Sequence, residues 1–349
     1  MRPANRLSTD QLSLADKTNP WVPEGAIDSG RTVPPFARLL DFLILLAVHH
    51  IRRRVMHNSD ILVGIVTLNR RDKLVRTLAE CRRLGFHHIV VLDNGSADGT
   101  RDFLQKQPDI ACILSERNEG GSGGFNRIMR YFIEHSASSF LLTMDDDAYP
   151  TFKCAELALF LENRSTDRYP AYAFRVTYPH GSLCEMNRPG LNVLTQNPFW
   201  KLKRDFHIEE STEECSVDFA GFVGLLIKRE TIQNVGIVSK NFFIYSDDTY
   251  YTLSISRSAG KLLYYPKFVF IHDCKRSSRH FANHDPLRLE RDVTNKVVVI
   301  REFSSFKIEY VLLYIARLIF LNPKVSASIL LACGKGLTVD CSLYRNETI

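Results

Sequence analysis

Apolar runs of strand length alternate with segments of helical spacing over much of this chain. Ile61–Thr67 is almost continuously apolar, as expected for a parallel strand that is buried on both faces. Three later runs have the same character: His88–Asp93, Ala111–Ser115 and Phe140–Met144. Three segments between them have helical spacing: Arg71–Arg83, the segment that begins at Asp98–Gly99, and Gly123–Glu134. The alternation predicts a parallel sheet between two layers of helices, which is an α/β fold.

Polar residues follow each predicted strand at the point where the strand ends. In parallel sheets, ligands bind beyond the carboxyl ends of the strands. The polar segments at these ends are Thr67–Asn69, Asp93–Ser96, Arg117–Asn118 and Asp145–Asp147. We therefore expect a binding site at this edge of the sheet.

Two apolar segments lie outside the alternating pattern. Phe36–Ile51 contains an unbroken apolar run, Phe42–Val48, which is far shorter than the ~20 residues of a membrane span. Two interpretations stay open. The segment is either a helix that packs on the main domain or on a second subunit, or an interfacial helix whose basic residues Arg52–Arg54 face anionic lipid. Tyr310–Leu321, which Pro323 ends, predicts a helix for which core packing and membrane-surface docking are both open.

The pattern divides the chain into three parts. An N-terminal extension with an amphipathic helix covers residues 1–58, the α/β domain covers 59–300, and a C-terminal helical segment covers 301–349. The hydrophobic share of 45% and the charged share of 24% are ordinary for a globular protein with a sizeable core. The net charge of +6 permits a phosphate ligand or a lipid surface, and we expect no nucleic-acid partner.

Cysteine use indicates a cytoplasmic protein. The eight cysteines include no pair at C-x-x-C spacing, which argues against a zinc ribbon. A chain of 349 residues does not need a disulfide framework, so reduced, buried thiols are the simpler interpretation. The first residues, MRPANRLSTDQ, have no apolar signal-peptide core.

Asp145, Asp146 and Asp147 come directly after the fourth predicted strand. Three adjacent carboxylates repel one another, so ionising all of them is costly unless a cation compensates. Strand alternation places Asp145 and Asp147 on one side and Asp146 on the other. Hard oxygen ligands suit Mg²⁺ or Mn²⁺. A solvated acidic loop is the alternative, but the position at a strand end favours the metal site.

A glycine-rich stretch, Asn118–Phe125, precedes the third predicted helix. Its four glycines are Gly120, Gly121, Gly123 and Gly124. They would let the backbone approach a ligand, and the following helix N-terminus favours an anion. The stretch matches neither a Walker A loop nor G-x-G-x-x-G. Alone, it leaves a purely structural turn equally open.

A second acidic pair and a histidine complete the candidate residues. Asp247 and Asp248 open a predicted helix, where a helix cap would account for one of them better than for both. Asp248 is therefore the candidate general base, and Asp247 either caps the helix or binds the acceptor. His272 ends the strand Lys267–Ile271 and could be a third cation ligand, although most lone histidines are structural. Asp273 could orient the imidazole, although neighbours on a strand point apart.

In this order, the motifs resemble the family 2 glycosyltransferases of GT-A fold. Six segments between Ile61 and Asp273 carry the resemblance: GIVTLNRRDKL, VVLDNGSADGT, LLTMDDDA, FAGFVGLLIKRETIQNVG, FFIYSDDTYY and IHD. NEGGSGGF followed by the three aspartates is most similar to the bacterial galactofuranosyltransferase branch. The resemblance implies a Rossmann-like mixed sheet flanked by helices, with the terminal parts of the chain outside the shared motifs.

The resemblance also implies roles for single residues. Thr67 and Asp93 should contact the uridine, with Asn69 in the same donor-binding set. The residues expected near the diphosphate or the sugar are Asn118, Gly120, Gly121, Gly123, Gly124 and Asp146. Asp145, Asp147 and His272 should hold the cation, Mn²⁺ or Mg²⁺. Asp248 should be the base of an inverting displacement, with Asp247 nearby.

We therefore expect metal-dependent, inverting transfer of galactofuranose from a UDP-sugar to a hydroxyl of a cell-surface glycan or lipid-linked acceptor. Ser246 stands where the family usually has Trp, and Tyr250 where it often has an acidic residue, so another hexosyl- or rhamnosyltransferase and a non-catalytic scaffold stay open. A nucleotidyltransferase would need a glycine-rich loop after the first strand, and Thr67–Arg71 contains no glycine. The expected location is cytoplasmic, peripheral on the inner face of the membrane, and a homo-oligomer is left open.

Overall fold

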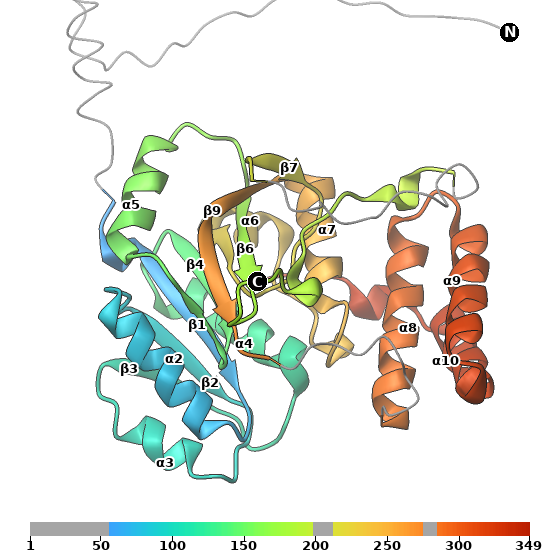
Figure 1. The fold of residues 1–349 in the computed structure, drawn as a ribbon, viewed down its shortest axis with the longest axis horizontal. Coiled ribbons are helices and arrows are strands. Elements are labelled where there is room, and N and C mark those ends of the chain that lie inside the picture. The colour runs from blue at the N-terminus through green and yellow to red at the C-terminus, as the bar shows by residue number, and fades with distance from the viewer. Residues whose placement is uncertain (1–55, 198–211, 275–284) are drawn as a thin grey trace, which may run out of the picture. The chain divides into compact units, whose positions relative to one another are not determined.

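The first four strands of the sheet lie parallel, as the alternating pattern predicts. In the computed structural model, which describes residues 56–197, 212–274 and 285–349, they lie side by side in the order β3-β2-β1-β4 (Figure 1). Their bounds are Ile61–Thr67 for β1, Ile89–Asp93 for β2, Ile110–Leu114 for β3 and Phe140–Asp145 for β4. Thr67 pairs with Asp93, and Val66 pairs with Asp145. The polar residues at the strand ends therefore come level at one edge.

The second half of the sheet is mixed. Its strands are β5 (Ala148–Pro150), β6 (Ala171–Thr177), β7 (Cys215–Val217), β8 (Leu225–Lys228) and β9 (Leu262–His272). The order continues β4-β8-β6-β9-β5, with β7 also on β9. β8 is antiparallel to both β4 and β6, whereas β6 and β9 are parallel. A wholly parallel sheet is therefore wrong for the chain, and the mixed sheet that the family resemblance implies is confirmed.

Helices cover both faces of the sheet, which makes three layers (Figure 1). On one face, a buried apolar cluster joins the strands to α2 (Arg71–Arg83), α3 (Thr100–Gln105) and α5 (Cys154–Asn163). On the other face, a second cluster joins them to α4 (Gly120–His135), α6 (Arg229–Val235) and α7 (Asp247–Ala259). Along β1, Val63 and Ile65 enter the first cluster and Leu62 the second, which is the period of two that a strand imposes.

Three helices follow at the C-terminal end: α8 (Pro286–Phe303), α9 (Lys307–Leu321) and α10 (Ser326–Thr338). They pack on one another around Val293, Val297 and Ile329. Asn295 of α8 donates to the carbonyls of Phe242, Ile244 and Tyr245, which lead into α7. The predicted C-terminal helix is confirmed as α9, whereas the predicted boundary at residue 301 falls inside α8.

Of the two apolar segments outside the α/β pattern, the structure describes only Tyr310–Leu321, which lies in α9. Phe36–Ile51 lies outside the described residues. Among the described helices, no single one has the length and apolar character of a membrane span, and α9 with the following helix meets those criteria only as a pair bent by 114°.

Candidate active site

Three of the predicted cation ligands meet at the edge of the sheet. Asp145 ends β4, and His272 ends β9, which β5 brings alongside by pairing Ala148 with His272. The His272 Nε2 lies 3.1 Å from Asp147 Oδ1 and 3.6 Å from Asp145 Oδ2. One ligand atom from each of the three residues lies within 4.8 Å of the others. Two carboxylates and an imidazole nitrogen in this arrangement fit a divalent cation such as Mn²⁺ or Mg²⁺.

Basic side chains near this cluster balance its negative charge. Arg70 Nη1 lies 2.9 Å from Asp147 Oδ2, and Lys73 Nζ lies 3.4 Å from the same oxygen. Burial opposes ionisation of Asp147, but His272, Arg70 and Lys73 lower its pKa below the usual range. Burial would lower the pKa of His272, but its bonds to Asp147 and Cys184 raise that pKa to about 10. The ring therefore holds a proton that a cation bound at Nε2 would replace.

The Asp146 carboxylate is not part of the group formed by Asp145, Asp147 and His272. It accepts a hydrogen bond from Thr67 Oγ1 at 2.8 Å, and Arg70 Nη1 lies 3.3 Å from it. Burial raises the pKa of Asp146 to about 6. Asp146 thus ties the end of β4 to the end of β1, and its role toward the sugar stays a prediction.

The other nitrogen of His272 faces a different set of groups. His272 Nδ1 lies 2.8 Å from Asn187 Oδ1 and 3.8 Å from Cys184 Sγ. The suggestion that Asp273 orients the ring is wrong, because the Asp273 carboxylate lies 3.2 Å from Arg76 and 3.7 Å from Lys73 instead. The sequence carries no spacing signal for Asn187, which lies in a loop 85 residues before His272.

Asp247 and Asp248 begin α7, as predicted. Tyr245 and Ser246 have φ values of 68° and 64°, an uncommon backbone turn that leads into the helix. Burial raises the pKa of both carboxyls, and the charge of Asp248 raises that of Asp247 further. A backbone bond from Thr249 and the nearby charge of Lys296 work against the rise in the Asp248 pKa. The two buried carboxyls therefore disfavour carrying two negative charges at once.

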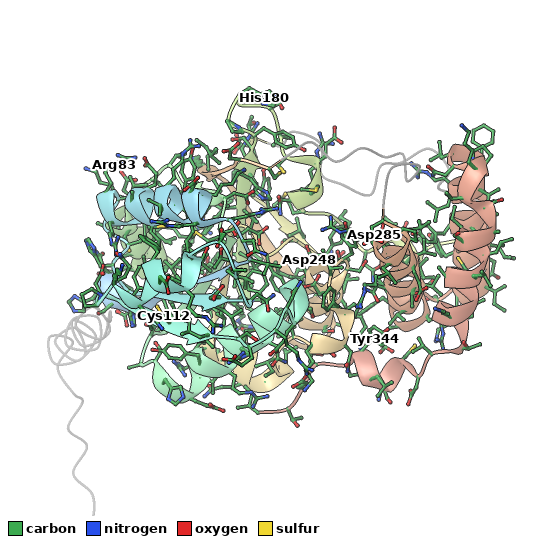
Figure 2. The ribbon with its side chains drawn as sticks, turned by 90° about the horizontal axis from the view of Figure 1, so that it is seen from below. Arg83, Cys112, His180, Asp248, Asp285 and Tyr344 are labelled. Carbon is green, nitrogen blue, oxygen red and sulfur yellow. The ribbon has the colours of Figure 1, made fainter. Side chains whose placement is uncertain are left out.

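Asp248 lies near Asn187, the side-chain partner of His272, and Figure 2 labels Asp248 in the middle of the molecule. Gly221 connects the two regions: a Cβ there would lie 2.8 Å from Asn187 Nδ2 and 3.3 Å from Asp248 Oδ2. The Asp248 charge also acts on Asp145, whose pKa is raised by burial, by Asp147 and by Asp248, against the opposing charge of His272. The candidate base thus lies near enough to the candidate cation ligands for its charge to act on Asp145.

The glycine-rich stretch forms the first turns of α4 rather than a loop before it. Gly120 has φ +75°, and a Cβ there would lie 2.0 Å from the Phe243 carbonyl oxygen. A Cβ at Gly124 would lie 2.7 Å from Val66, and one at Gly123 would lie 2.7 Å from the Glu119 Cβ. Only Gly121, of these four, has no atom within 4 Å of such a Cβ. Gly121 therefore leaves room for a ligand, while the other three are required by the packing of the chain itself.

The remaining predicted donor-binding residues join neighbouring strand ends. Asp93 is fully buried and accepts a hydrogen bond from Ser96 N at 3.0 Å. Asn69, with φ 52°, accepts one from Ala97 N at 2.7 Å. Asn118 Oδ1 accepts bonds from Gly120 N and Asn94 Nδ2. These contacts bring the residues to one edge, while their contacts with a donor stay predictions.

A cavity of about 500 Å³ lies elsewhere, between α8, α10 and the turn before α7. Its lining includes Asn241, Arg291, Asn295, Lys335 and Tyr344, and none of the three cation ligands. The candidate chemistry therefore lies outside this cavity, at the open edge of the sheet.

Comparison with known proteins gives the family context. Residues 62–228 match the family described as glycosyl transferase family 2. The dTDP-rhamnosyl transferase RfbF of Shigella flexneri is 21% identical over 251 residues, which cover 70% of this chain and 81% of that protein. The galactofuranosyltransferase GlfT1 of Mycolicibacterium smegmatis is 24% identical over 211 residues, which cover 55% of this chain and 64% of that protein.

A solved structure has a similar fold. The crystal structure of GalNAc-T7 with UDP, GalNAc and Mn2+ matches with a TM-score of 0.51 and 17% identity. The match covers 81% of this chain and 61% of that one. At this identity, the likeness concerns the fold alone.

Proposed function

This chain belongs to the glycosyl transferase family 2 and is a glycosyltransferase of GT-A fold, and from that premise we propose that it transfers galactofuranose from a UDP-sugar to a glycan hydroxyl. The observation that carries the proposal is the meeting of Asp145, Asp147 and His272, with Asp248 at the start of α7 near enough for its charge to act on Asp145. This arrangement offers a cation site and a base at one edge of the sheet, which are the two groups that the reaction requires.

The transfer is a single displacement with inversion. The acceptor oxygen attacks the anomeric carbon, the bond from that carbon to the diphosphate breaks, and Asp248 takes the acceptor proton. Asp145, Asp147 and His272 would hold Mn²⁺ or Mg²⁺, which supplies positive charge against the leaving diphosphate. Arg70 and Lys73 both lie at the Asp147 carboxylate and add positive charge there. Gly121, at the start of α4, leaves space for the donor.

Two relatives support different sugars. The similarity to GlfT1 and the NEGGSGGF stretch favour galactofuranose. The similarity to RfbF, which covers more of this chain, favours a rhamnosyl donor as the second candidate. Ser246, which differs from the family pattern, directly precedes the acidic pair, where a change would alter the fit of the sugar. Tyr250, which also differs, is buried against Phe242 and Phe303 instead.

The acceptor proposed for this reaction is lipid-linked, and the exposed apolar side chains of α9 and α10 support this proposal and a membrane contact. Four large apolar side chains of these helices are 61–84% exposed: Ile308, Leu312, Phe320 and Leu331. Lys307, Arg317 and Lys324 are exposed on the same segment. Apolar side chains beside basic ones suit an anionic membrane surface. The proposed location is the cytoplasmic face of the membrane.

A donor screen tests the function. Release of nucleoside diphosphate is measured with UDP-galactofuranose, other UDP-sugars and dTDP-rhamnose, with and without Mn²⁺. The expected result is cation-dependent release from UDP-galactofuranose that Asp145→Asn abolishes and Asp102→Asn, on the exposed side of α3, leaves unchanged. Release from dTDP-rhamnose alone would contradict galactofuranose as the donor sugar and support rhamnose instead. Release that does not depend on a cation would overturn the mechanism.

A further inference from the structure

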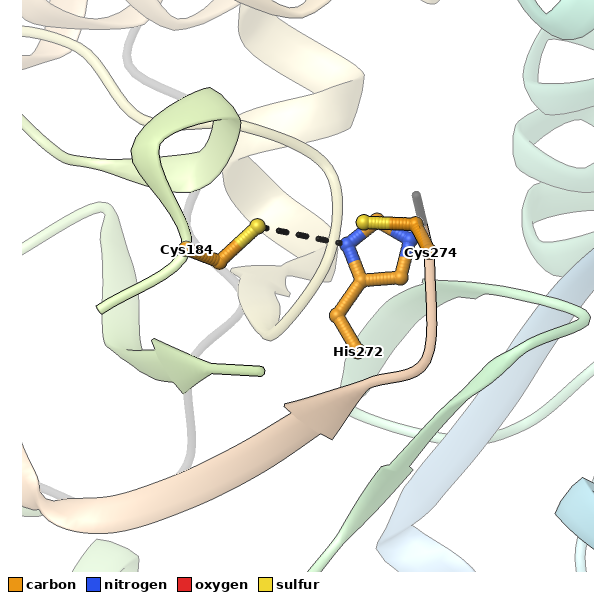
Figure 3. A group of neighbouring side chains, drawn as sticks. All are labelled: Cys184, His272 and Cys274. Carbon is orange, nitrogen blue, oxygen red and sulfur yellow. Dashed lines mark hydrogen bonds between the residues drawn. The ribbon is translucent and has the colours of Figure 1, made fainter. Parts of the chain in front are cut away.

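A second group of potential metal ligands lies on the opposite side of the His272 ring from Asp147. Cys184 precedes a short helical turn at Glu185–Asn187, while Cys274 follows His272 by two residues (Figure 3). One ligand atom from each of Cys184, His272 and Cys274 lies within 4.8 Å of the others. Cys184 is fully buried and His272 is 3% exposed. The cluster therefore joins two distant segments of the chain at the active site.

We propose that Cys184, Cys274 and His272 form a binding site for a thiophilic cation, with Zn²⁺ as its representative. Two sulfurs and one imidazole nitrogen are the donors that Zn²⁺ prefers. In a tetrahedral zinc site, a sulfur and a nitrogen ligand lie roughly 3.5 Å apart. Cys184 Sγ lies 3.8 Å from His272 Nδ1, so a small side-chain movement closes the site.

Tyr178 provides an independent observation. Its side chain is 4% exposed, and its hydroxyl interacts with the Cys184 sulfur, without a hydrogen bond to an oxygen or nitrogen of the described residues. A buried tyrosine hydroxyl normally has a partner. A metal-bound Cys184 thiolate would be a better acceptor for this hydroxyl than a neutral thiol, which makes Tyr178 an outer support of the site.

The fourth position has a candidate occupant. Asn187 Oδ1 lies 2.8 Å from His272 Nδ1 and 3.2 Å from Cys184 Sγ. This oxygen could complete the zinc coordination, or water could take its place, as in zinc sites with three protein ligands.

The two cation sites compete for one imidazole, an inference that rests on the proposed function. A neutral imidazole has one free nitrogen lone pair. When Zn²⁺ binds His272 Nδ1, Nε2 keeps its hydrogen and donates it to Asp147, which lies 3.1 Å away. His272 is then lost to the Mn²⁺ or Mg²⁺ that the transfer needs. Binding of Zn²⁺ at the two thiols therefore inhibits the enzyme.

Cobalt binding tests the site without any sugar substrate. The reduced, metal-free protein is titrated with Co²⁺, and the thiolate-to-cobalt charge-transfer band in the near ultraviolet is recorded. The expected band corresponds to one Co²⁺ per chain and disappears in Cys184→Ser and in Cys274→Ser. It stays in Asp145→Asn, which lacks a carboxylate of the other site, and in Cys112→Ser, a control on β3 (Figure 2). No band in the native protein, or a band that survives both cysteine changes, overturns the site.

Two further measurements use the native chain and separate the alternatives. Zn²⁺ should protect the partly exposed Cys274, but not the exposed Cys112, from alkylation that is read by mass spectrometry. If Cys184 and Cys274 are instead joined in a disulfide in freshly purified protein, the metal site is contradicted. In the transfer assay, Cys184→Ser should need at least about tenfold more Zn²⁺ for half inhibition at fixed Mn²⁺. Equal inhibition of native and Cys184→Ser protein overturns the competition, whereas absence of transfer with any sugar contradicts only the proposed function.

Discussion

The cluster at the sheet edge and the outer face of α9 and α10 break the usual rule of burial in opposite directions. Asp147 is 3% exposed although it is a carboxylate, and Phe320 is 84% exposed although it is apolar. The Asp147 charge is balanced by Arg70 and Lys73 at the start of α2 and by His272 at the end of β9, which are far apart in the sequence. Four large apolar side chains of α9 and α10, Ile308, Leu312, Phe320 and Leu331, stay at the surface. The first pattern is the basis of the proposed cation site, and the second is the basis of the proposed membrane contact.

This comparison makes the two regions separable by mutation. Changes in the cluster should alter cation binding and turnover while membrane binding stays the same. Changes on α9 and α10 should lower membrane binding, while cation binding and turnover with a water-soluble acceptor stay the same. A single change that alters both properties equally would break the comparison.

The largest expected effect concerns Asp248. Asp248→Asn removes the proposed base and should lower turnover by about 10²–10⁴-fold, with donor affinity retained. Steady-state rates and a donor-binding titration measure the two quantities. Because burial raises the Asp248 pKa, turnover of the native enzyme should fall as the pH drops below that raised value. Near-normal turnover of Asp248→Asn would remove Asp248 from the mechanism.

The next effect concerns Asn187, whose side chain holds the far side of the His272 ring. Asn187→Ala should weaken Mn²⁺ binding by about 10–100-fold, as expected for loss of a group that orients a metal-binding histidine. Saturating Mn²⁺ should restore much of the rate, because Asn187 positions a ligand and does not touch the reacting atoms. A loss of rate with unchanged Mn²⁺ affinity would instead place Asn187 at the substrate.

A smaller effect is expected on the apolar face. The double change Phe320→Ser and Leu331→Ser should reduce binding to anionic lipid vesicles by at least about tenfold, since each buried apolar side chain contributes about 1.5–3 kcal/mol. Vesicle sedimentation measures the binding. Leu159→Ser on α5 is the matched control, because Leu159 is 59% exposed on a different helix. Equal binding of the double variant and the control would contradict the membrane contact.

The core of the site could be predicted from the sequence because it follows regular structure. Asp145 and His272 end strands, so strand alternation and the strand-end rule bring them to one edge. Asp247 and Asp248 open a helix at the predicted position. The order of the family motifs along the chain predicts which residues share the site. The first four strands lie in the predicted parallel arrangement.

The outer parts of the site could not be predicted, because they come from irregular segments. Asn187 and Cys184 lie in a loop after β6, where no periodic pattern fixes side-chain direction. Spacing rules for metal sites search for cysteines close together in sequence, and Cys184 and Cys274 are far apart. Sequence proximity allows Asp273 to orient His272, but the folded chain turns the Asp273 carboxylate toward Arg76. The glycine-rich pattern alone predicts a loop before the helix, because the packing of these glycines against Phe243 and Val66 exists only in the folded chain.

The most direct test of the central claim is a measurement of Mn²⁺ binding in the presence of UDP. The free ion is quantified by its electron paramagnetic resonance signal. The native chain should bind one Mn²⁺, while Asp147→Asn and His272→Ala should each lose most of that affinity. Asp102→Asn should bind as the native chain does, and the folded state of each variant is checked by circular dichroism. Native affinity in both Asp147→Asn and His272→Ala would contradict the assignment of the cation to Asp145, Asp147 and His272.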